Sequence, residues 1–245
     1  MTVKPRAKKA SWISEKPEST ATRVERQIKE AVLSGKLKAG EVLGSENELA
    51  AQFGVSRLPI REALSRLSAL GIIEIRTGAG GGARIAESAN PSAAIEALAL
   101  QFQLAGVTVD EVFVAQYTLE TAAIPLAAKE ATDEELDAIE AAIGLAEAAV
   151  NGGERFTRAS LNVHQLMVDA AHNHVLSAVM QAVTAVLYRA LLKGTNEQTA
   201  KGVVKHHRQV LQALRQRDPE AVRMAVIPYL ERVRRHTNEL FRDEN

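Results

Sequence analysis

Two short helical patterns meet at a glycine in the first third of the chain, and this junction limits the folds available there. Ser45 and Glu48 have the spacing of a capping box, so a helix is predicted to begin at Ser45. Gly54 supplies the left-handed backbone that a tight turn requires, and Ser56 is placed to cap a second helix. Gly71 is predicted to end that helix. Two helices joined so closely indicate a helix-turn-helix motif.

A β-hairpin is predicted directly after the second helix. Residues 72–75 and 84–85 are short apolar segments that flank a glycine-rich loop over residues 77–82. Such a loop can lie against a sugar–phosphate backbone because it carries few Cβ atoms. A phosphate-binding loop for nucleotides is the alternative, but no GxxxxGK[ST] sequence is present. A helix-turn-helix followed by a hairpin is a winged helix-turn-helix, and it predicts binding to DNA.

Arg57 and Arg61 are the best candidates for reading bases. They lie four residues apart and so share one helix face, whereas Ile60, Leu64 and Leu67 form a separate, buried stripe. A guanidinium can donate two hydrogen bonds to guanine in the major groove. The alternative is an ordinary solvated face of charged residues. Beside the turn and the wing, the two arginines favour DNA recognition.

Charge is unevenly distributed along the chain. Residues 1–87 hold 15 Lys or Arg against 10 Glu, whereas the remainder holds 15 basic and 20 acidic residues. This asymmetry indicates an anionic partner for the first part. Residues 1–19 are predicted to form a disordered basic arm and not a signal peptide. The chain has no cysteine, and no apolar run is expected to span a membrane, so a cytoplasmic location without membrane contact is expected.

The segments LGSENELA and GVSRLPIREAL, residues 43–50 and 54–64, resemble motifs of the GntR family of DNA-binding regulators. The resemblance covers a domain over residues 20–87. It implies a homodimer that binds a double-stranded operator, with base contacts from the two arginines and minor-groove contacts from the wing. Asn47 departs from the pattern, because many relatives carry an arginine there. The predicted DNA contacts are Ser45, Asn47, Ser56, Arg57, Leu58, Pro59, Arg61, Thr77, Gly78 and Gly80.

Only helical patterns follow Asn90. Seven helices are predicted, over about residues 90–104, 109–131, 132–150, 156–171, 175–193, 198–217 and 219–241. Pro125 and Pro228 fall inside two of them and are expected to kink them. Seven helices with short loops predict an all-α bundle. The fold class expected for the whole chain is therefore mostly α, with one small β-hairpin wing.

Residues 93–240 resemble the FCD domain, the ligand-sensing bundle of the FadR subfamily. The matching pieces are Leu119-Glu120 with residues 126–128, His164 with Asn173, His207 with Val210, Leu211 and Ala213, and residues 218–221. The resemblance implies a domain that binds a small-molecule effector and also dimerises. It further implies that effector binding controls the affinity for the operator.

A metal site is only partly retained. FCD domains are similar in holding a divalent metal with one aspartate and three histidines, and here His164 and His207 match two of the histidines. Ser160 stands at the aspartate position and Tyr229 at the last histidine position. His172, His174 and His206 are possible substitutes. The sequence therefore does not favour a filled site, although zinc, nickel or manganese remains an alternative.

The same polar residues could instead line an effector pocket. The predicted lining residues are Gln116, Ser160, His164, His207 and Tyr229. Gln116 replaces the arginine with which the family grips carboxylates, so a neutral or larger effector is expected. The alternative is a satisfied polar network in a core without a ligand.

The sequence predicts a DNA-binding transcriptional regulator, and the resemblance implies that it is a repressor whose operator affinity an effector controls. One alternative is a constitutive dimeric DNA-binding protein with a non-functional pocket. Another is a metal-dependent hydrolase, but the chain has no HExxH motif. No catalytic activity is therefore expected.

Overall fold

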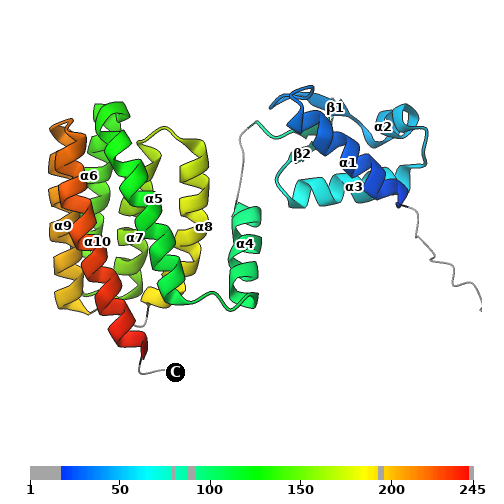
Figure 1. Cartoon of the computed structure of the whole chain (residues 1–245). Coiled ribbons are helices and arrows are strands. Elements are labelled where there is room, and N and C mark those ends of the chain that lie inside the picture. The colour runs from blue at the N-terminus through cyan, green and yellow to red at the C-terminus, as the bar shows by residue number, and fades with distance from the viewer. Residues whose placement is uncertain (1–17, 79–80, 88–91, 193–195, 243–245) are drawn as a thin grey trace, which may run out of the picture. The chain divides into compact units, whose positions relative to one another are not determined.

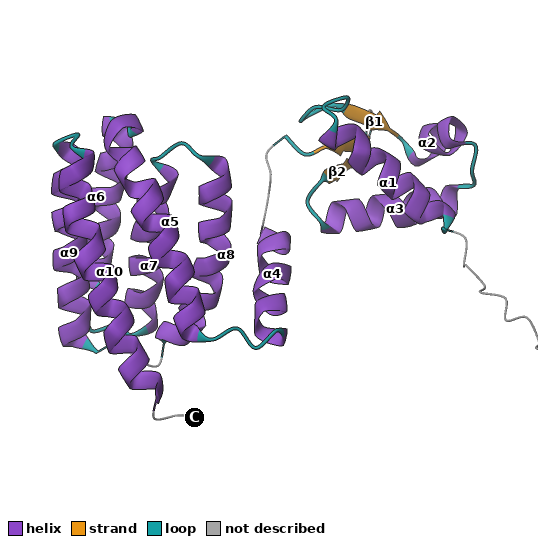
Figure 2. Cartoon of the chain, viewed as in Figure 1, coloured by secondary structure: helices purple, strands orange, loops and turns teal. Residues whose placement is uncertain are grey.

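The computed structural model describes residues 18–78, 81–87, 92–192 and 196–242. The chain divides into two compact units, Met1–Asn90 and Pro91–Asn245, which are coloured by residue number in Figure 1. Figure 2 shows that helices dominate both units and that strands occur only in the first. The predicted fold class is confirmed. Gly80, the predicted helix start at residues 90–91 and most of the predicted basic arm lie outside the described residues.

The first unit is a small helical domain with one three-stranded sheet. Its elements are α1 Thr20–Leu33, β1 Val42–Gly44, α2 Glu46–Phe53, α3 Arg57–Ala69, β2 Ile73–Arg76 and β3 Gly82–Ile85. The strand order is β1-β3-β2, and both pairings are antiparallel. The predicted hairpin is β2 and β3, with Ile73 opposite Ile85. Strand β1 is not predicted from the sequence, because its three residues are too few to show the alternation of apolar and polar side chains that marks a strand.

Local signals set the two ends of the helix-turn-helix. The capping box of α2 is present, since the Ser45 hydroxyl accepts from the Glu48 backbone N–H and the Glu48 carboxylate accepts from the Ser45 N–H. Gly54 has φ +64 and Gly71 φ +69, so both occupy the left-handed region that favours glycine. These predictions are confirmed.

Ser56 occupies the predicted N-cap position of α3 but does not make the hydrogen bond of a cap. Ser56 stands at the N-cap with extended backbone, but its side chain makes no capping hydrogen bond. Pro59 is the third residue of the helix and has no N–H, so the donor that Ser45 uses in α2 is absent in α3. The Ser56 hydroxyl is exposed instead of tied to the helix.

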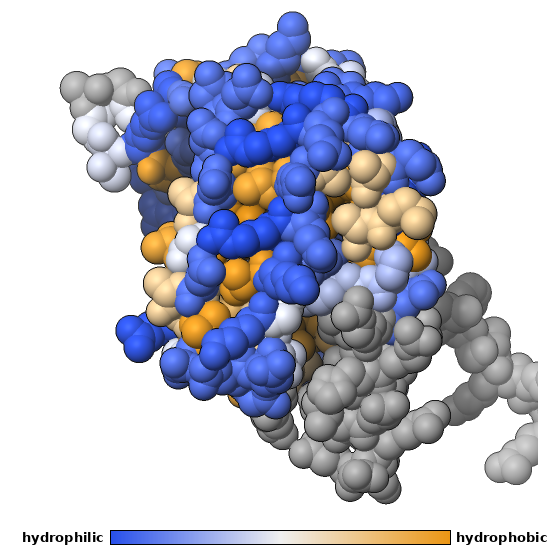
Figure 3. Space-filling view, turned by 90° about the vertical axis from the view of Figure 1, so that its left-hand side faces the viewer, coloured by the Kyte–Doolittle hydropathy of each residue, from blue (hydrophilic) through white to orange (hydrophobic). Residues whose placement is uncertain are grey.

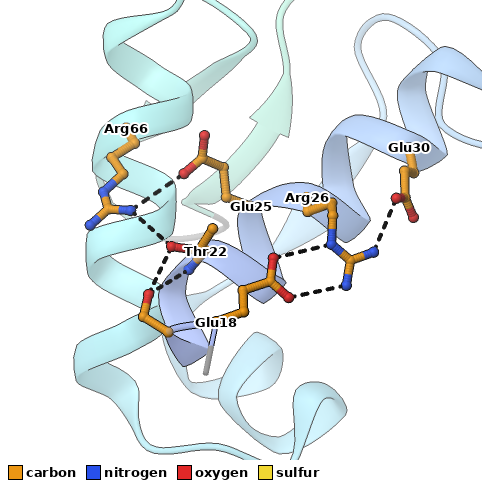
Figure 4. A network of polar contacts seen from close by, with 7 residues as sticks. Glu18, Thr22, Glu25, Arg26, Glu30 and Arg66 are labelled. Carbon is orange, nitrogen blue, oxygen red and sulfur yellow. Dashed lines mark hydrogen bonds and ion pairs between the residues drawn. The ribbon is translucent and has the colours of Figure 1, made fainter. Parts of the chain in front are cut away.

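The core of the first unit holds α3 against α1. The predicted stripe of Ile60, Leu64 and Leu67 is fully or almost fully buried, and it packs with Val24 and Ile28 of α1. Polar contacts add to this packing, as Figure 4 shows: the Arg66 guanidinium lies 3.6 Å from Glu25 and 3.5 Å from the Thr22 hydroxyl. The apolar contacts supply most of the stability, because exposed ion pairs contribute little.

The second unit contains seven described helices, as predicted. They are α4 Ser92–Leu104, α5 Val109–Glu130, α6 Asp133–Ala148, α7 Glu154–Asp169, α8 His174–Leu191, α9 Glu197–Arg215 and α10 Pro219–Arg242. Helix α5 contacts α7, α8, α9 and α10, while α4 packs on α8. Two apolar clusters fill the interior, and α5 and α7 contribute to both. This arrangement places polar residues of α5 and α7 inside the bundle.

Two helices of the bundle begin with capping boxes. The box formed by Thr132 and Glu135 starts α6, and a second one, formed by Thr108 and Glu111, starts α5. Pro125 lies inside α5 and Pro228 inside α10. The kinks expected at these prolines stay predictions.

Helix α8 is long and apolar enough, by length and composition, to cross a membrane. Core helices of bundles pass the same test, so this finding does not contradict the expectation that no apolar run spans a membrane. Single polar residues such as Ser177 and Gln181 interrupt the apolar run, but the mean hydropathy of the helix stays high enough for a membrane span. The helix nevertheless belongs to the bundle, where it packs against α4, α5 and α7.

One face of the bundle is hydrophilic and grooved. Figure 3 shows this face, where hydrophilic side chains surround visible apolar residues. A groove of about 450 Å³ lies between α9 and the end of α6, lined by Val150, Val204, Lys205 and Arg208 among others. It lies apart from the buried polar residues of α5 and α7.

Candidate DNA-binding and effector sites

The first candidate site is the exposed start of α3. Arg57 and Arg61 lie there with about three fifths of their side chains exposed, at 60% and 61%. Both contact one carboxylate, that of Glu46 at the start of α2. Arg61 donates from Nε to Glu46 Oε1 at 3.0 Å and from Nη2 to Oε2 at 2.9 Å, while Arg57 Nη2 lies 3.5 Å from Oε2. The turn at Gly54 thus brings the two predicted base-reading residues to one acidic residue.

The pairing changes the titration of its members. Hydrogen bonding to Arg61 is the main cause that lowers the pKa of Glu46, and contact with Arg57 lowers it further. The carboxylate in turn raises the pKa of Arg61. Glu46 therefore stays ionised at neutral pH, and the start of α3 carries two cations beside one anion.

The other predicted DNA contacts lie at three places in the first unit. Leu58 and Ser56 are exposed at the start of α3, and Pro59 is half-buried there. Asn47 is exposed in the first turn of α2, next to the half-buried Ser45. Thr77 and Gly78 are exposed after β2. Exposure of these residues does not show that they contact DNA, so their assignment as DNA contacts stays a prediction.

Glycine is required where the wing meets β1. Gly82 of β3 has φ +147, and a Cβ on it would lie 2.8 Å from the Gly44 carbonyl oxygen of β1. That distance is too short for a Cβ, and the obstacle is backbone that cannot turn aside. The close approach of β1 and β3 therefore restricts this position of the wing to glycine.

The second candidate site is a buried polar cluster in the bundle. Gln116 and Glu120 reach it from α5, His164 from α7 and His207 from α9; all are buried. Gln116 Nε2 donates to Glu120 Oε1 at 2.6 Å, and His164 Nδ1 lies 3.0 Å from the same oxygen. The two imidazoles face each other, with Nε2 of His164 and Nε2 of His207 3.1 Å apart. From the sequence, Glu120 is recognisable only as part of the Leu119-Glu120 motif, and its contact with His164 is not.

The two imidazoles of this cluster differ in their affinity for a proton, and His164 is the one that holds the positive charge. Burial lowers the pKa of His164, but the charge and contact of Glu120 outweigh it, so the pKa lies above its ordinary value. Burial, and then the charges of His164 and His206, hold the pKa of His207 well below its ordinary value. We therefore assign the proton of the His164–His207 contact to His164 Nε2, which leaves His207 neutral with its hydrogen on Nδ1. Within the described residues, His207 Nδ1 has no hydrogen-bond partner.

The remaining candidate residues divide between this cluster and the surface. Ser160 is buried on α7. Tyr229 of α10 is half-buried, and its ring stacks on His206 with 3.5 Å between ring centroids and 9° between planes. His172 is exposed and pairs with Glu135, and His174 is exposed at the start of α8. Of the possible substitutes, only His206 lies inside the bundle.

The cluster does not fit a divalent metal. Among the described residues, no three His, Cys, Asp or Glu side chains are placed to hold one ion. Two imidazoles supply half of a tetrahedral set, and the carboxylate of Glu120 contacts the far nitrogen of His164. Ser160 and the stacked Tyr229 are poor replacements for an aspartate and a histidine.

Known families match both units. The family described as bacterial regulatory proteins, gntR family, matches residues 20–82, and the FCD domain matches residues 111–232. The transcriptional regulator LutR of Bacillus subtilis is 30% identical over 65% of this chain and 72% of its own length. The transcriptional repressor NanR of Klebsiella aerogenes is 26% identical over 86% of this chain and 82% of its own.

A solved structure has the same fold. Streptococcus agalactiae GntR aligns with a TM-score of 0.60 over 88% of this chain and 99% of its own, at 22% identity. At that identity the likeness concerns the fold, and it supports the order of a winged helix-turn-helix followed by a helical bundle.

Proposed function

We propose that this chain, which belongs to the GntR family of bacterial regulatory proteins, represses transcription from an operator that it reads with Arg57 and Arg61. With its GntR and FCD domains, it is a DNA-binding transcriptional regulator of the effector-controlled type. The observation that carries the proposal is the pair of exposed arginines at the start of α3, directly after the turn at Gly54. Helices in this position read the major groove.

Residues 20–87 are proposed as the DNA-binding domain, with the residues after β2 as a wing against the backbone. Thr77 and Gly78 are exposed there, and backbone contacts of a wing would fix the register of α3 on the duplex. The Ser56 hydroxyl, which makes no capping bond, is available for a phosphate. Ser45, Asn47, Leu58 and Pro59 complete the proposed surface.

The protein is proposed to act as a homodimer on a two-fold symmetric operator. Support comes from α4 and α8, which expose several large apolar residues: Leu98, Leu100, Leu104, Val175 and Val179. Exposed large apolar residues on two helices that pack together are a feature of protein–protein interfaces. A dimer through residues 93–240 would present two copies of α3 to two half-sites. The proposed location is the cytoplasm, where the operator lies.

The effector is proposed to bind at the buried cluster without a metal. Gln116 offers no positive charge, and His207 Nδ1 is a buried donor without a partner among the described residues. An effector with a hydrogen-bond acceptor and little net charge would satisfy that donor. Because His164 already contacts both Glu120 and His207, a constitutive regulator with a closed polar core is the second candidate. The relatives are transcriptional regulators, and we assign no catalysis to the chain.

Selection from random-sequence duplex DNA with the purified chain tests the proposal. We expect one enriched two-fold symmetric site, and Arg61→Ala should weaken binding to it by about 1–3 kcal/mol and relax one base position in each half-site. Lack of enrichment would contradict sequence-specific binding. An equal loss on all sequences would make Arg61 a phosphate contact and not a base reader.

Elemental analysis of the same protein, after dialysis against zinc, nickel or manganese, tests metal independence. We expect substoichiometric metal in each case. Stoichiometric metal that a His164→Ala variant loses would overturn this part of the proposal. Release of the selected duplex by a small molecule would favour the effector-controlled regulator over the constitutive one.

A further inference from the structure

The two arginines that are proposed to read bases share a carboxylate with no assigned role. Glu46 takes two hydrogen bonds from Arg61 and lies near Arg57, and these contacts join the first turn of α2 to the first turns of α3. The capping box of α2 does not use Glu46, because Ser45 and Glu48 form it. The side chain is therefore not needed to start its own helix.

The geometry of the Arg61 contact leaves part of the guanidinium open. A guanidinium has five N–H donors in one plane. Glu46 accepts from Nε and from one hydrogen of Nη2, which is the side edge of the group. Both hydrogens of Nη1 and the second hydrogen of Nη2 remain, and the end edge consists of one hydrogen from each of these two nitrogens. Two parallel donors on that edge match O6 and N7 of guanine.

From this geometry we infer that Glu46 is a positioning residue for base recognition: it holds Arg61 by the side edge so that the end edge meets guanine. The inference rests on the proposed role of Arg61. A long exposed arginine loses rotamer freedom when it binds a base, and prior fixation reduces that loss. The two-point contact with Glu46 also fixes the plane of the guanidinium, as bidentate pairs do.

The carboxylate should also disfavour DNA without the right base. Glu46 places a negative charge beside the two cations, so it opposes binding that depends only on phosphates. A correct guanine offsets that cost by bonding the prepared edge of Arg61, whereas random DNA does not. Glu46 is thus inferred to raise the ratio of operator affinity to random-DNA affinity in two ways: it strengthens binding to the operator and weakens binding to random DNA.

Binding of the full-length Glu46→Gln chain to the selected operator and to a scrambled duplex tests this inference. We expect the operator Kd to rise about tenfold, within the range of one bidentate base contact, while the Kd for the scrambled duplex stays the same or falls. The loss of base preference should occur at the operator position that Arg61→Ala relaxes. Glu62→Gln is the matched control, because it removes an exposed carboxylate from the position next to Arg61, and it should leave the affinity ratio unchanged.

A double-mutant cycle separates the possible failures. In an Arg61→Ala background, Glu46→Gln should not raise the operator Kd further. If Arg61→Ala alone leaves the operator Kd unchanged, the proposed function fails. If Arg61→Ala weakens binding but Glu46→Gln does not, or if Glu46→Gln shifts both duplexes equally, the role of Glu46 is overturned.

Discussion

Glu46 and Glu120 each bind a cationic side chain, but one lies at the surface of the first unit and the other lies inside the second. The Glu46 side chain is 31% exposed and its arginines about 60%, whereas Glu120 is 1% exposed and His164 8%. The surface pair is screened by water and exchanges partners at low cost. The buried pair cannot separate without leaving a charge unpaired in a medium of low polarity.

The difference in burial suits the two sites to different tasks. At the surface, an arginine can keep its carboxylate and still offer free N–H groups to a ligand that arrives from solvent. In the bundle, the charge is already balanced by Glu120, so a ligand must match hydrogen bonds and not charge. Among the described residues, His207 Nδ1 makes no hydrogen bond, and His164 Nδ1 has only its 3.0 Å approach to Glu120 Oε1.

The largest effect should come from breaking the buried pair. Glu120→Ala should lower the free energy of unfolding of the bundle by about 3–5 kcal/mol, because the His164 imidazolium loses its counter-charge and must lose its proton or remain unpaired. Urea unfolding followed by far-UV circular dichroism measures this change. Glu130→Ala is the matched control, since Glu130 is exposed on the same helix, and it should change stability by less than about 0.5 kcal/mol. Equal effects of the two substitutions would remove the distinction between buried and exposed carboxylates.

A smaller effect is expected from pH, and the part of it near pH 6.5 should come from the two buried histidines. The raised pKa of His164 contributes stability that is complete below its unfolded value, about 6.5, and is lost as pH rises through the folded value. The depressed pKa of His207 has the opposite consequence: stability falls as pH drops below about 6.5, because only the unfolded chain takes up that proton. The bundle should therefore be most stable near pH 6.5, with slopes of up to about 1.4 kcal/mol per pH unit on either side.

Urea unfolding in the presence of a chelator, over a pH series, measures this dependence. Glu120→Gln should flatten the alkaline side and His207→Asn the acid side. A wild-type bundle whose stability does not change between neutral and mildly acidic pH would contradict the proton assignment in the cluster.

The smallest effect contrasts two serines at helix starts in the first unit. Ser45→Ala should cost about 1 kcal/mol of unfolding free energy, because the Glu48 N–H loses its acceptor. Ser56→Ala should cost less than about 0.5 kcal/mol, because its hydroxyl makes no capping bond, but it should weaken operator binding. Unfolding and binding measured on the same two variants test this. Equal losses of stability would mean that Ser56 caps α3 after all.

The sequence was sufficient for features that depend on neighbouring residues. The starts of α2 and α6 follow from capping boxes within four consecutive residues, and the turn follows from Gly54. The buried stripe of α3 follows from helical spacing alone. Such signals are local, so they can be read without knowledge of the fold.

Features that depend on tertiary contact could not be predicted in this way. β1 is recognisable only by its pairing with β3. The role of Glu46 depends on an arginine fifteen residues away on another helix, and that of Glu120 on a histidine of α7. Burial of His206 likewise depends on Tyr229 of α10. For Glu46, Glu120 and His206 the sequence shows the type of residue, but the packing of helices determines which residue it contacts.

The capping boxes of α2, α5 and α6 also bear on how the chain folds. Each box closes between residues only three apart, so it can form before any contact between helices exists. Proteins rich in local contacts reach their transition states quickly, because little chain entropy is lost before the first interactions form. Gln116 and Glu120 lie four residues apart in α5, so they share one face of the helix as soon as it forms. A refolding chain that forms α5 early would therefore already hold Gln116 and Glu120 on one side, and the later assembly of the bundle would bring His164 to the Glu120 carboxylate.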